Sequence, residues 1–258
     1  MGWFNWSRKV TEEYRAGGGT LGLDVNASRV RAVASETGRP PRVALLDDPH
    51  EELPLAVSLE RPAAEVGRAA LGLARRLPHM GCFDFLNDVG QPREWKVGRH
   101  RVTANQLVAL ALDRVRAACP RPDNLTLVLP TYLGTPKVSA LANLMTKAQL
   151  PVRGSAVAPL ALVAGGDPAR TRPHVTLVVD VDDHALTGAV VQCEASQARL
   201  LATTTQPRLN VRVWKERLLN ALADRCVRTC RRDPRDTPAA DQALYEQIDD
   251  ALDRLRSG

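Results

Sequence analysis

Two aspartates occupy equivalent places in the chain, and their surroundings define the first candidate site. Asp24 lies at the end of one apolar run and Asp180 at the end of another, and a short polar turn and a second apolar segment follow each of them. Carboxylates at the mouths of two facing hairpins can hold a magnesium ion, while backbone N–H groups of the turns contact its phosphate partners. The pattern predicts a magnesium–phosphate site between two halves of the chain, with Asp24 and Asp180 as metal ligands.

The segments around these aspartates have the patterns of strands. Two continuous apolar runs, 125–129 and 175–181, are typical of strands buried on both faces. Residues 26–28 predict a tight turn between two strands. Six segments are predicted as strands: Leu21–Val25, Arg29–Ser35, Arg42–Leu46, Leu125–Leu129, Val175–Val181 and Ala185–Gln192.

Helical periodicity fills much of the remaining sequence. A capping box from Thr103 to Gln106 opens one helix, and Asp233-Pro234 separates the last two. The predicted helices are Pro62–Leu77, Thr103–Cys119, Pro136–Ala148, Val211–Arg232 and Ala239–Arg256. Strands and helices alternate in two passes, residues 20–166 with a small insertion at about 47–101, and residues 174–258. This order predicts a two-lobed α/β protein.

Residues 1–19 are predicted to form a separate appendage. Trp3, Trp6, Val10 and Tyr14 share one face of an amphipathic helix, and Gly17–Gly19 is predicted to act as a hinge. Such a face can dock on a partner, lie at a membrane surface or pack on its own domain. The sequence leaves these readings open.

The composition is that of an ordinary globular protein. The 258 residues are 44% hydrophobic and 25% charged, with a net charge of +6, which excludes disordered, collagen-like and coiled-coil classes. No run approaches the roughly 18 apolar residues of a membrane span, and the first residues lack the order of a signal peptide. A cytoplasmic protein is therefore expected. The five scattered cysteines are expected to be structural.

Several stretches share the pattern of one family. Gly22–Val25 and Val179–Val181 are similar to its two phosphate motifs, and Val66–Leu71 to one of its helices. Leu129–Pro159 follows the family without a gap, and Leu209–Leu219 keeps the register of a later motif. These segments resemble the nucleotide-binding domain of the heat-shock protein 70 chaperones, an actin-like ATPase. Residues 28–33 suit the cell-division and pilus-type actin homologues at least as well.

The resemblance implies a two-lobed actin-like (ribonuclease-H-like) fold whose second lobe is incomplete, with ATP or ADP and Mg²⁺ between the lobes. It implies nucleotide contacts at Asp24, Asn26, Ser28, Asp180, Asp182 and Asp183. The family's glycine-rich second turn reads Asp182-Asp183-His184 here, so side chains occupy the space where phosphate must touch the backbone. These two carboxylates can repel phosphate, recruit metal, or simply form a good turn.

Further departures affect the chemistry that the resemblance implies. The family's lysine position is Leu71, its glutamate position is Ala158, and its later Gly-Gly is Asn210-Val211. Without the lysine and the glutamate, no residue at these positions offsets transition-state charge or orients the attacking water. We therefore expect a degenerate ATPase that binds nucleotide weakly or not at all and does not turn it over as a chaperone does.

The incomplete second lobe is expected to leave apolar surface uncovered, which favours a homodimer or a protein partner. The first hypothesis is therefore a protein-binding or scaffold module, and the alternative is an ATP-hydrolysing chaperone-type protein with altered site residues. A second alternative is a nucleic-acid binder, disfavoured by interspersed acids and by 4% aromatic content. Its candidate residues are Arg208, Arg212, Lys215, Arg225, Arg228, Arg231, Arg232 and Arg235.

Overall fold

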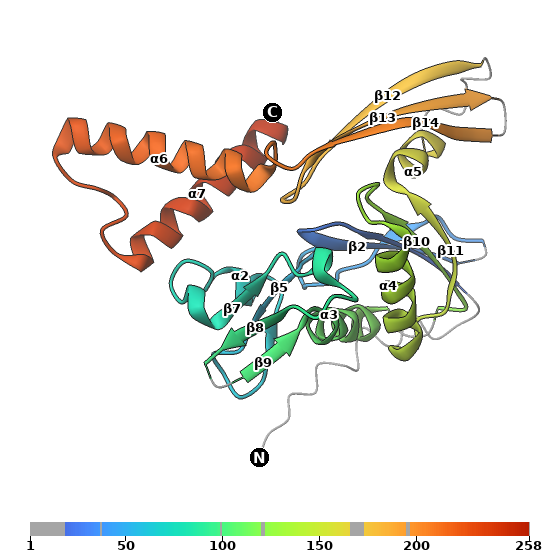
Figure 1. Ribbon diagram of the computed structural model, residues 1–258, viewed down its shortest axis with the longest axis horizontal. Helices are drawn as coiled ribbons and strands as arrows, with labels where there is room; N and C mark the ends of the chain where they lie inside the picture. The colour runs from blue at the N-terminus through green and yellow to red at the C-terminus, as the bar shows by residue number, and fades with distance from the viewer. Residues whose placement is uncertain are drawn as a thin grey trace.

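The computed structural model describes residues 19–257 apart from residues 37 and 99 and the segments 120–121, 166–172 and 195–196. The predicted amphipathic helix lies in residues 1–18, outside the described part of the chain. Figure 1 shows a mixed α/β architecture, with a central sheet, a second sheet to one side and two long helices to the other. No helix among the described residues is long and apolar enough to cross a bilayer.

The central sheet has mixed strand directions. Strand β1 (Thr20–Val25) runs parallel to β10 (Asn124–Leu129), which runs parallel to β11 (Val152–Val157), whereas β2 (Arg29–Ser35) is antiparallel to β1. The strand order is β11-β10-β1-β2-β3, with β3 at Arg42–Val43, and β4 (Glu52–Pro54) also pairs with β2. The predicted hairpin of β1 and β2 is confirmed, and β11 was not predicted. Because β1 and β10 are parallel, their carboxyl ends meet at one edge of the sheet.

Two helices share one core with the central sheet. Helix α3 (Ala104–Ala118) begins at the predicted capping box, in which Thr103 and Gln106 each accept the other's backbone N–H. Helix α4 (Thr135–Lys147) has a proline in its first turn, where the fixed φ of the ring suits a helix. Leu23 of β1 and Met145 of α4 are fully buried in this core. Burying a side chain of this size contributes about 1.5–3 kcal/mol.

The face of β10 that points away from this core is more open than predicted. Leu125, Leu127 and Leu129 are buried, but Thr126 is exposed and Val128 is half-buried. The prediction of a strand buried on both faces was therefore wrong for β10. The short helix α5 (Ala158–Ala164) is the element that contacts β10 and β11 on this side, and seven residues are too few to cover it.

Residues 56–103 form small strands and turns. The elements of this segment are β5 (Ala56–Ser58), β6 (Glu65–Val66), α2 (Arg68–Leu71), the 3-10 turns Pro78–Met80 and Leu86–Asp88, β7 (Gly81–Phe83), β8 (Glu94–Val97) and β9 (His100–Thr103). The predicted long helix over Pro62–Leu77 was wrong. Val66 pairs with Val57 in a ladder, so the apolar spacing reflects a strand followed by turns.

Gly67 explains why the chain turns between β6 and α2. Its φ is +88°, a left-handed value that favours glycine. A Cβ on Gly67 would lie 2.4 Å from Asp47 Oδ2, and the same oxygen accepts the N–H of Arg68 at 2.7 Å. A carboxylate remote in sequence therefore caps α2, an interaction that no local pattern predicts.

The second sheet is an antiparallel meander of β12 (His174–Val181), β13 (Leu186–Glu194) and β14 (Gln197–Gln206). Helix α5 packs on one face of this meander sheet. The pairing of β12 with β13 is confirmed, but β12 is not buried on both faces, because its alternate residues from Val175 to Val181 are exposed. Strand β14 was not predicted.

The chain then forms a helical hairpin of α6 (Val211–Cys230) and α7 (Pro238–Ser257). The Asn210 side chain caps the start of α6 by accepting the N–H of Val213 at 2.8 Å. Arg231, in the left-handed region with φ 59°, ends it. Both predicted helices are confirmed.

Candidate functional site

The turn between β1 and β2 keeps its hydrogen-bond donors to itself. Asn26 N–H donates to Arg29 O at 3.0 Å. Asn26 Oδ1 accepts the N–H groups of Ser28 and Arg29 and the Ser28 hydroxyl, each at 3.0 Å. Such a turn, closed by an Asn side chain, is typical of Asx geometry. Three of the backbone donors that could contact a phosphate at this hairpin already have acceptors.

The turn between β12 and β13 is closed in the same way by Asp182. Its N–H donates to Ala185 O at 3.1 Å. Its Oδ1 accepts the N–H groups of His184 at 2.8 Å and Ala185 at 2.9 Å. These hydrogen bonds support the interpretation of Asp182 as a residue that forms a good turn.

The second oxygen of Asp182 joins the two turns. Asp182 Oδ2 accepts the Ala27 N–H at 3.4 Å and a short hydrogen bond from the Tyr132 hydroxyl. The Ala27 N–H also donates to the Tyr132 hydroxyl oxygen at 3.2 Å, and the Tyr132 ring lies 4.6 Å from the His184 ring, centroid to centroid. Asp182 is only 6% exposed. The Asp182 and Tyr132 side chains thus bridge the two turns, and we call Ala27, Tyr132 and Asp182 the turn junction.

Tyr132 acts in the turn junction as a neutral donor. Burial raises the pKa of Tyr132 far above its ordinary value, and the adjacent Asp182 carboxylate raises it further. The phenol therefore stays protonated and donates to Asp182, so it is unsuited to act as a general base.

Asn210 and Val211, which the resemblance aligns with a Gly-Gly motif, lie beside the second turn. The N–H of Val211 donates to Asp182 O at 2.9 Å. Asn210 Nδ2 donates to Pro207 O at 2.7 Å and to His184 O at 3.4 Å. The start of α6 is thereby fixed to the turn that carries Asp182.

The two predicted metal ligands interact electrostatically. Burial raises the pKa of Asp24, and the Asp180 carboxylate raises it further, whereas Arg29 and Arg31 oppose the shift. Among the residues that the structure describes, no group of three or more His, Cys, Asp and Glu side chains could hold a metal ion. The magnesium site at Asp24 and Asp180 stays a prediction.

Asp183 faces the helical hairpin. Burial raises the pKa of Asp183, Lys215 and Arg212 of α6 lower it, and Asp182 and Asp249 raise it. Asp183 is thus electrostatically tied to α6 and α7, while Asp182 alone reaches the first turn.

The two positions that the resemblance assigns to catalysis carry no titratable side chain. Leu71 ends α2, and its carbonyl accepts a hydrogen bond from Gln242 Nε2 at 3.5 Å. Ala158 is the first residue of α5. Neither side chain can transfer a proton or offset charge on a phosphate.

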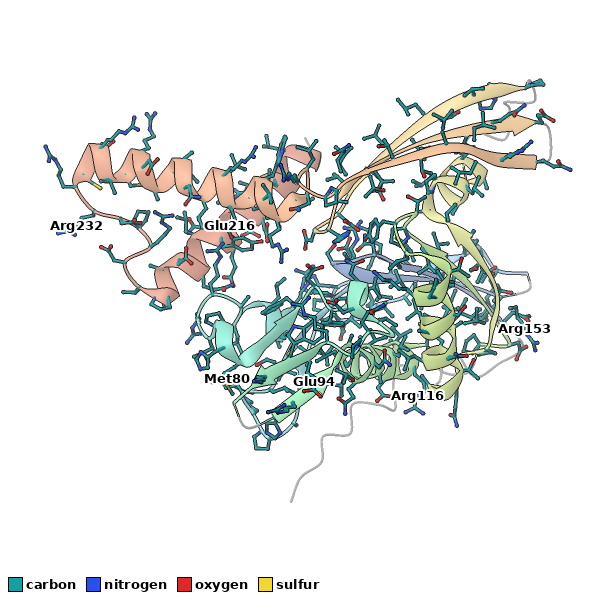
Figure 2. The ribbon with its side chains drawn as sticks, in the orientation of Figure 1. Met80, Glu94, Arg116, Arg153, Glu216 and Arg232 are labelled. Carbon is teal, nitrogen blue, oxygen red and sulfur yellow. The ribbon has the colours of Figure 1, made fainter. Side chains whose placement is uncertain are left out.

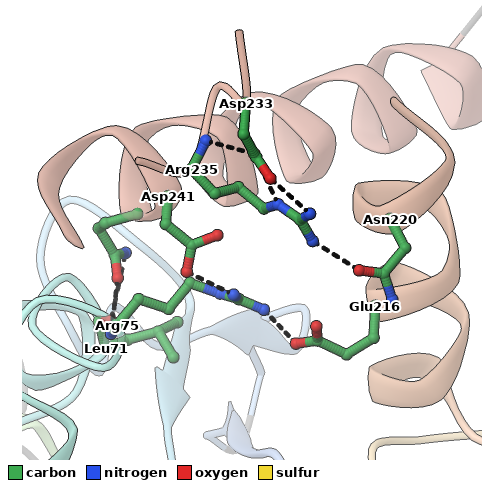
Figure 3. A network of polar contacts seen from close by, with 8 residues as sticks. Leu71, Arg75, Glu216, Asn220, Asp233, Arg235 and Asp241 are labelled. Carbon is green, nitrogen blue, oxygen red and sulfur yellow. Dashed lines mark hydrogen bonds and ion pairs between the residues drawn. The ribbon is translucent and has the colours of Figure 1, made fainter. Parts of the chain in front are cut away.

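A second junction joins the helical hairpin to the segment after α2 (Figure 3). Arg75 N–H donates to Gln242 Oε1 at 3.0 Å, and its guanidinium pairs with Asp241 at 2.7 Å and with Glu216. The guanidinium also lies 4.4 Å from the centre of the Tyr245 ring. The Arg75 side chain is 18% exposed, so these contacts are partly shielded from solvent. We call them the Arg75 junction.

Sequence reasoning missed Tyr132 and Arg75 as functional residues. Tyr132 follows the carboxyl end of β10, next to β1, and side chains at that edge of parallel strands commonly face a site. That placement is the signal that could have identified it. Arg75 lies within the wrongly predicted helix, so its contacts with α6 and α7 had no signal.

Comparison of the chain with known proteins gives no match to any protein-family model or to any curated protein.

Proposed function

We propose that the chain is a two-lobed module of the actin-like ATPase type, heat-shock-70-like, in which side chains replace the nucleotide and which binds another protein as a scaffold. The fold supports this proposal through a mixed sheet that begins with a hairpin and continues with two parallel strands. The central and meander sheets would be the centres of the two lobes.

The observation that carries the proposal is the hydrogen bonding of Asp182. In the actin-like arrangement, backbone N–H groups of two turns surround the phosphates. Here the Asp182 carboxylate, itself an anion, receives the N–H of Ala27 from the first turn and those of His184 and Ala185 from its own. An internal anion thus takes donors that a phosphate would need.

Electrostatic repulsion by the Asp182 carboxylate also disfavours phosphate binding between the turns. A phosphate placed within about 4 Å of Asp182 would be repelled by about 1 kcal/mol per charge in water and about 4 kcal/mol at an effective dielectric of 20. ATP would have to displace the Asp182 carboxylate from its bonds with the turns and with Tyr132. We therefore expect neither micromolar binding of ATP nor its hydrolysis.

Isothermal titration with Mg–ATP and Mg–ADP tests this proposal, with a heat-shock protein 70 nucleotide-binding domain as the positive control. The expected result is no saturable heat with either nucleotide and no phosphate release above background. Micromolar binding with steady turnover would refute the proposal and favour the alternative, a chaperone-type ATPase with altered residues. The Asp180 carboxylate contributes to the raised pKa of Asp24, and this electrostatic interaction between the two predicted metal ligands favours that alternative.

Exposed arginines on α6 favour the second alternative, a nucleic-acid binder. Three of the eight basic candidates form ion pairs, namely Arg212 with Asp84, Lys215 with Asp249 and Arg235 with Asp233. Figure 2 shows Arg232 at the end of α6 away from the meander sheet. The exposed candidates without an ion pair to a described carboxylate are Arg208, Arg225, Arg228, Arg231 and Arg232. Binding of a mixed-sequence oligonucleotide that weakens steeply with salt would support this alternative.

A further inference from the structure

One face of the meander sheet is apolar, and no element of the described chain covers it. Alternate residues of β12 point away from α5, and their exposed fractions are 63% for Val175, 68% for Leu177, 61% for Val179 and 46% for Val181. On the opposite face, alternate residues of β13, among them Ala189, are buried, and those of β12 are half-buried. Figure 1 shows α5 on one side of the sheet and, within the described part of the chain, no helix on the other.

The apolar surface continues across the neighbouring strands. Cross-strand partners in an antiparallel sheet point to the same side. Leu186 is the partner of Val181, Val190 of Leu177, and Ala202 of Val190. Leu201, at the bulge in β14, is 48% exposed as well.

Polar residues lie at the margin of this face. Gln192 is the partner of Val175, Arg199 is the partner of Gln192, and Gln192 Nε2 donates to Glu194 at 2.6 Å. An apolar centre with a polar, mixed-charge rim is the usual anatomy of a protein–protein interface. We call this surface the outer meander face.

The size of the outer meander face fits a homodimer. Its exposed valines and leucines present roughly 500 Å² of surface, which is within the range of about 300–600 Å² for the largest, often functional, apolar patch of a monomer. Each partner of a standard interface buries about 800 Å², and homodimer interfaces are about 65% apolar. The uncovered apolar area therefore matches what one protomer contributes to a dimer.

The charge distribution favours a second copy of this chain as the occupant. A two-fold interface places each patch against itself, so a patch of like charges would repel its mate. The centre of the outer meander face is uncharged, and its rim carries Arg199 and Glu194, of opposite sign. The exposed arginines on α6, by contrast, would oppose self-association there. Two such sheets can pack face to face about 10 Å apart.

We infer that the chain forms a symmetric homodimer in which the outer meander faces of two copies pack against each other. This inference rests on the proposed function, because it names the partner of the binding module. Its test involves no nucleotide, so the two can fail separately. A monomer that ignores Mg–ATP overturns the dimer alone, and a dimer that hydrolyses ATP overturns the proposed function alone.

Sedimentation equilibrium of the full chain over a wide dilution series measures the dimer, and Leu177→Asp disrupts it. Because the substitution would bury an unpaired carboxylate at the interface, we expect the dissociation constant to rise about 100-fold or more. The folded protomer tolerates the change, since Leu177 is largely exposed. Leu255→Asp on α7, at a residue 79% exposed and outside the face, is the matched control. It should leave the dissociation constant unchanged.

A second variant covers the case in which Leu177→Asp fails to fold, as judged by circular dichroism. Val179→Lys places a charge at the centre of the same face and should weaken the dimer to a similar extent. A wild-type chain that is monomeric at every concentration would overturn the inference. So would a dimer that resists both substitutions, or a monomer that binds lipid vesicles through this face.

Discussion

Replacing Asp182 with alanine is the sharpest test of the turn junction. The carboxylate accepts hydrogen bonds from His184 N, Ala185 N, Ala27 N and the Tyr132 hydroxyl. After the change, Ala27 N keeps the Tyr132 oxygen as an acceptor, and the half-buried His184 N can bind water. The Ala185 N–H remains buried without a partner, and the half-buried Tyr132 O–H loses its charged acceptor.

The expected loss follows from those two groups. A buried donor left without an acceptor costs about 1–3 kcal/mol, and a lost hydrogen bond to a charged group costs about 1.5–3 kcal/mol. Asp182→Ala should therefore lower the free energy of unfolding by about 2.5–6 kcal/mol. Tyr132→Phe removes one hydrogen bond to a charged acceptor and should cost about 1.5–3 kcal/mol. Because the two side chains bond to each other, the double variant should lose less than the sum of the single losses.

Urea unfolding followed by circular dichroism measures these values. Asp183→Ala is the matched control, because this neighbouring carboxylate is not an acceptor in the turn junction and should cost less than about 1 kcal/mol. Equal losses for Asp182→Ala and Asp183→Ala, or strictly additive losses with Tyr132→Phe, would show that the junction does not hold the two turns together.

Three further measurements test other parts of the structure. Gly67→Ala combines a left-handed φ with a clash against the carboxylate that caps α2, so it should lower the free energy of unfolding by about 2–4 kcal/mol. Gly38→Ala is the control, because Gly38 has a similar φ but open space around it. It should lower the free energy of unfolding, measured by thermal unfolding, by about 1 kcal/mol. Arg75→Ala should lower the free energy of unfolding by about 2–3 kcal/mol and speed amide exchange in α7. Arg93 is the control, because it forms an exposed ion pair and stacks on an aromatic ring, and Arg93→Ala should cost under about 1 kcal/mol. Equal effects of the two substitutions would contradict the Arg75 junction. Burial raises the pKa of Asp183 above its ordinary 3.8, so the wild-type protein should lose stability as the pH rises above 3.8 and through the raised pKa. Asp183→Asn, which does not titrate, should therefore gain stability relative to wild type as the pH rises above 3.8, and a pH-independent difference would count against this reasoning.

Local signals in the sequence predicted much of the secondary structure. The hairpin around residues 26–28, the capping box at Thr103, the proline that opens α4 and the two final helices all depend on short-range preferences. The acceptor roles of Asn26 and Asp182 in their own turns are of the same kind, because such side chains bond to backbone one to three residues away.

Patterns that depend on distant partners were misjudged. The apolar spacing of residues 62–77 satisfies a helix, but Val66 pairs with Val57, and Gly67 turns the chain under the side chain of Asp47. The apolar runs of β10 and β12 predicted strands buried on both faces, yet burial depends on which elements pack on each face. The short helix α5 leaves part of β10 open, and no described helix covers the outer face of β12.

The amino-acid sequence alone determined where the chain turns and which residues cap its helices, because these choices are made by neighbours along the backbone. Tertiary structure decided what the carboxylate of Asp182 does with its second oxygen. Ala27 and Asp182 are 155 residues apart along the chain, and only the approach of the meander sheet to the central sheet brings that oxygen to the N–H of Ala27. Whether such a turn receives a phosphate or a side chain depends on this long-range packing, which sequence-local preferences do not encode.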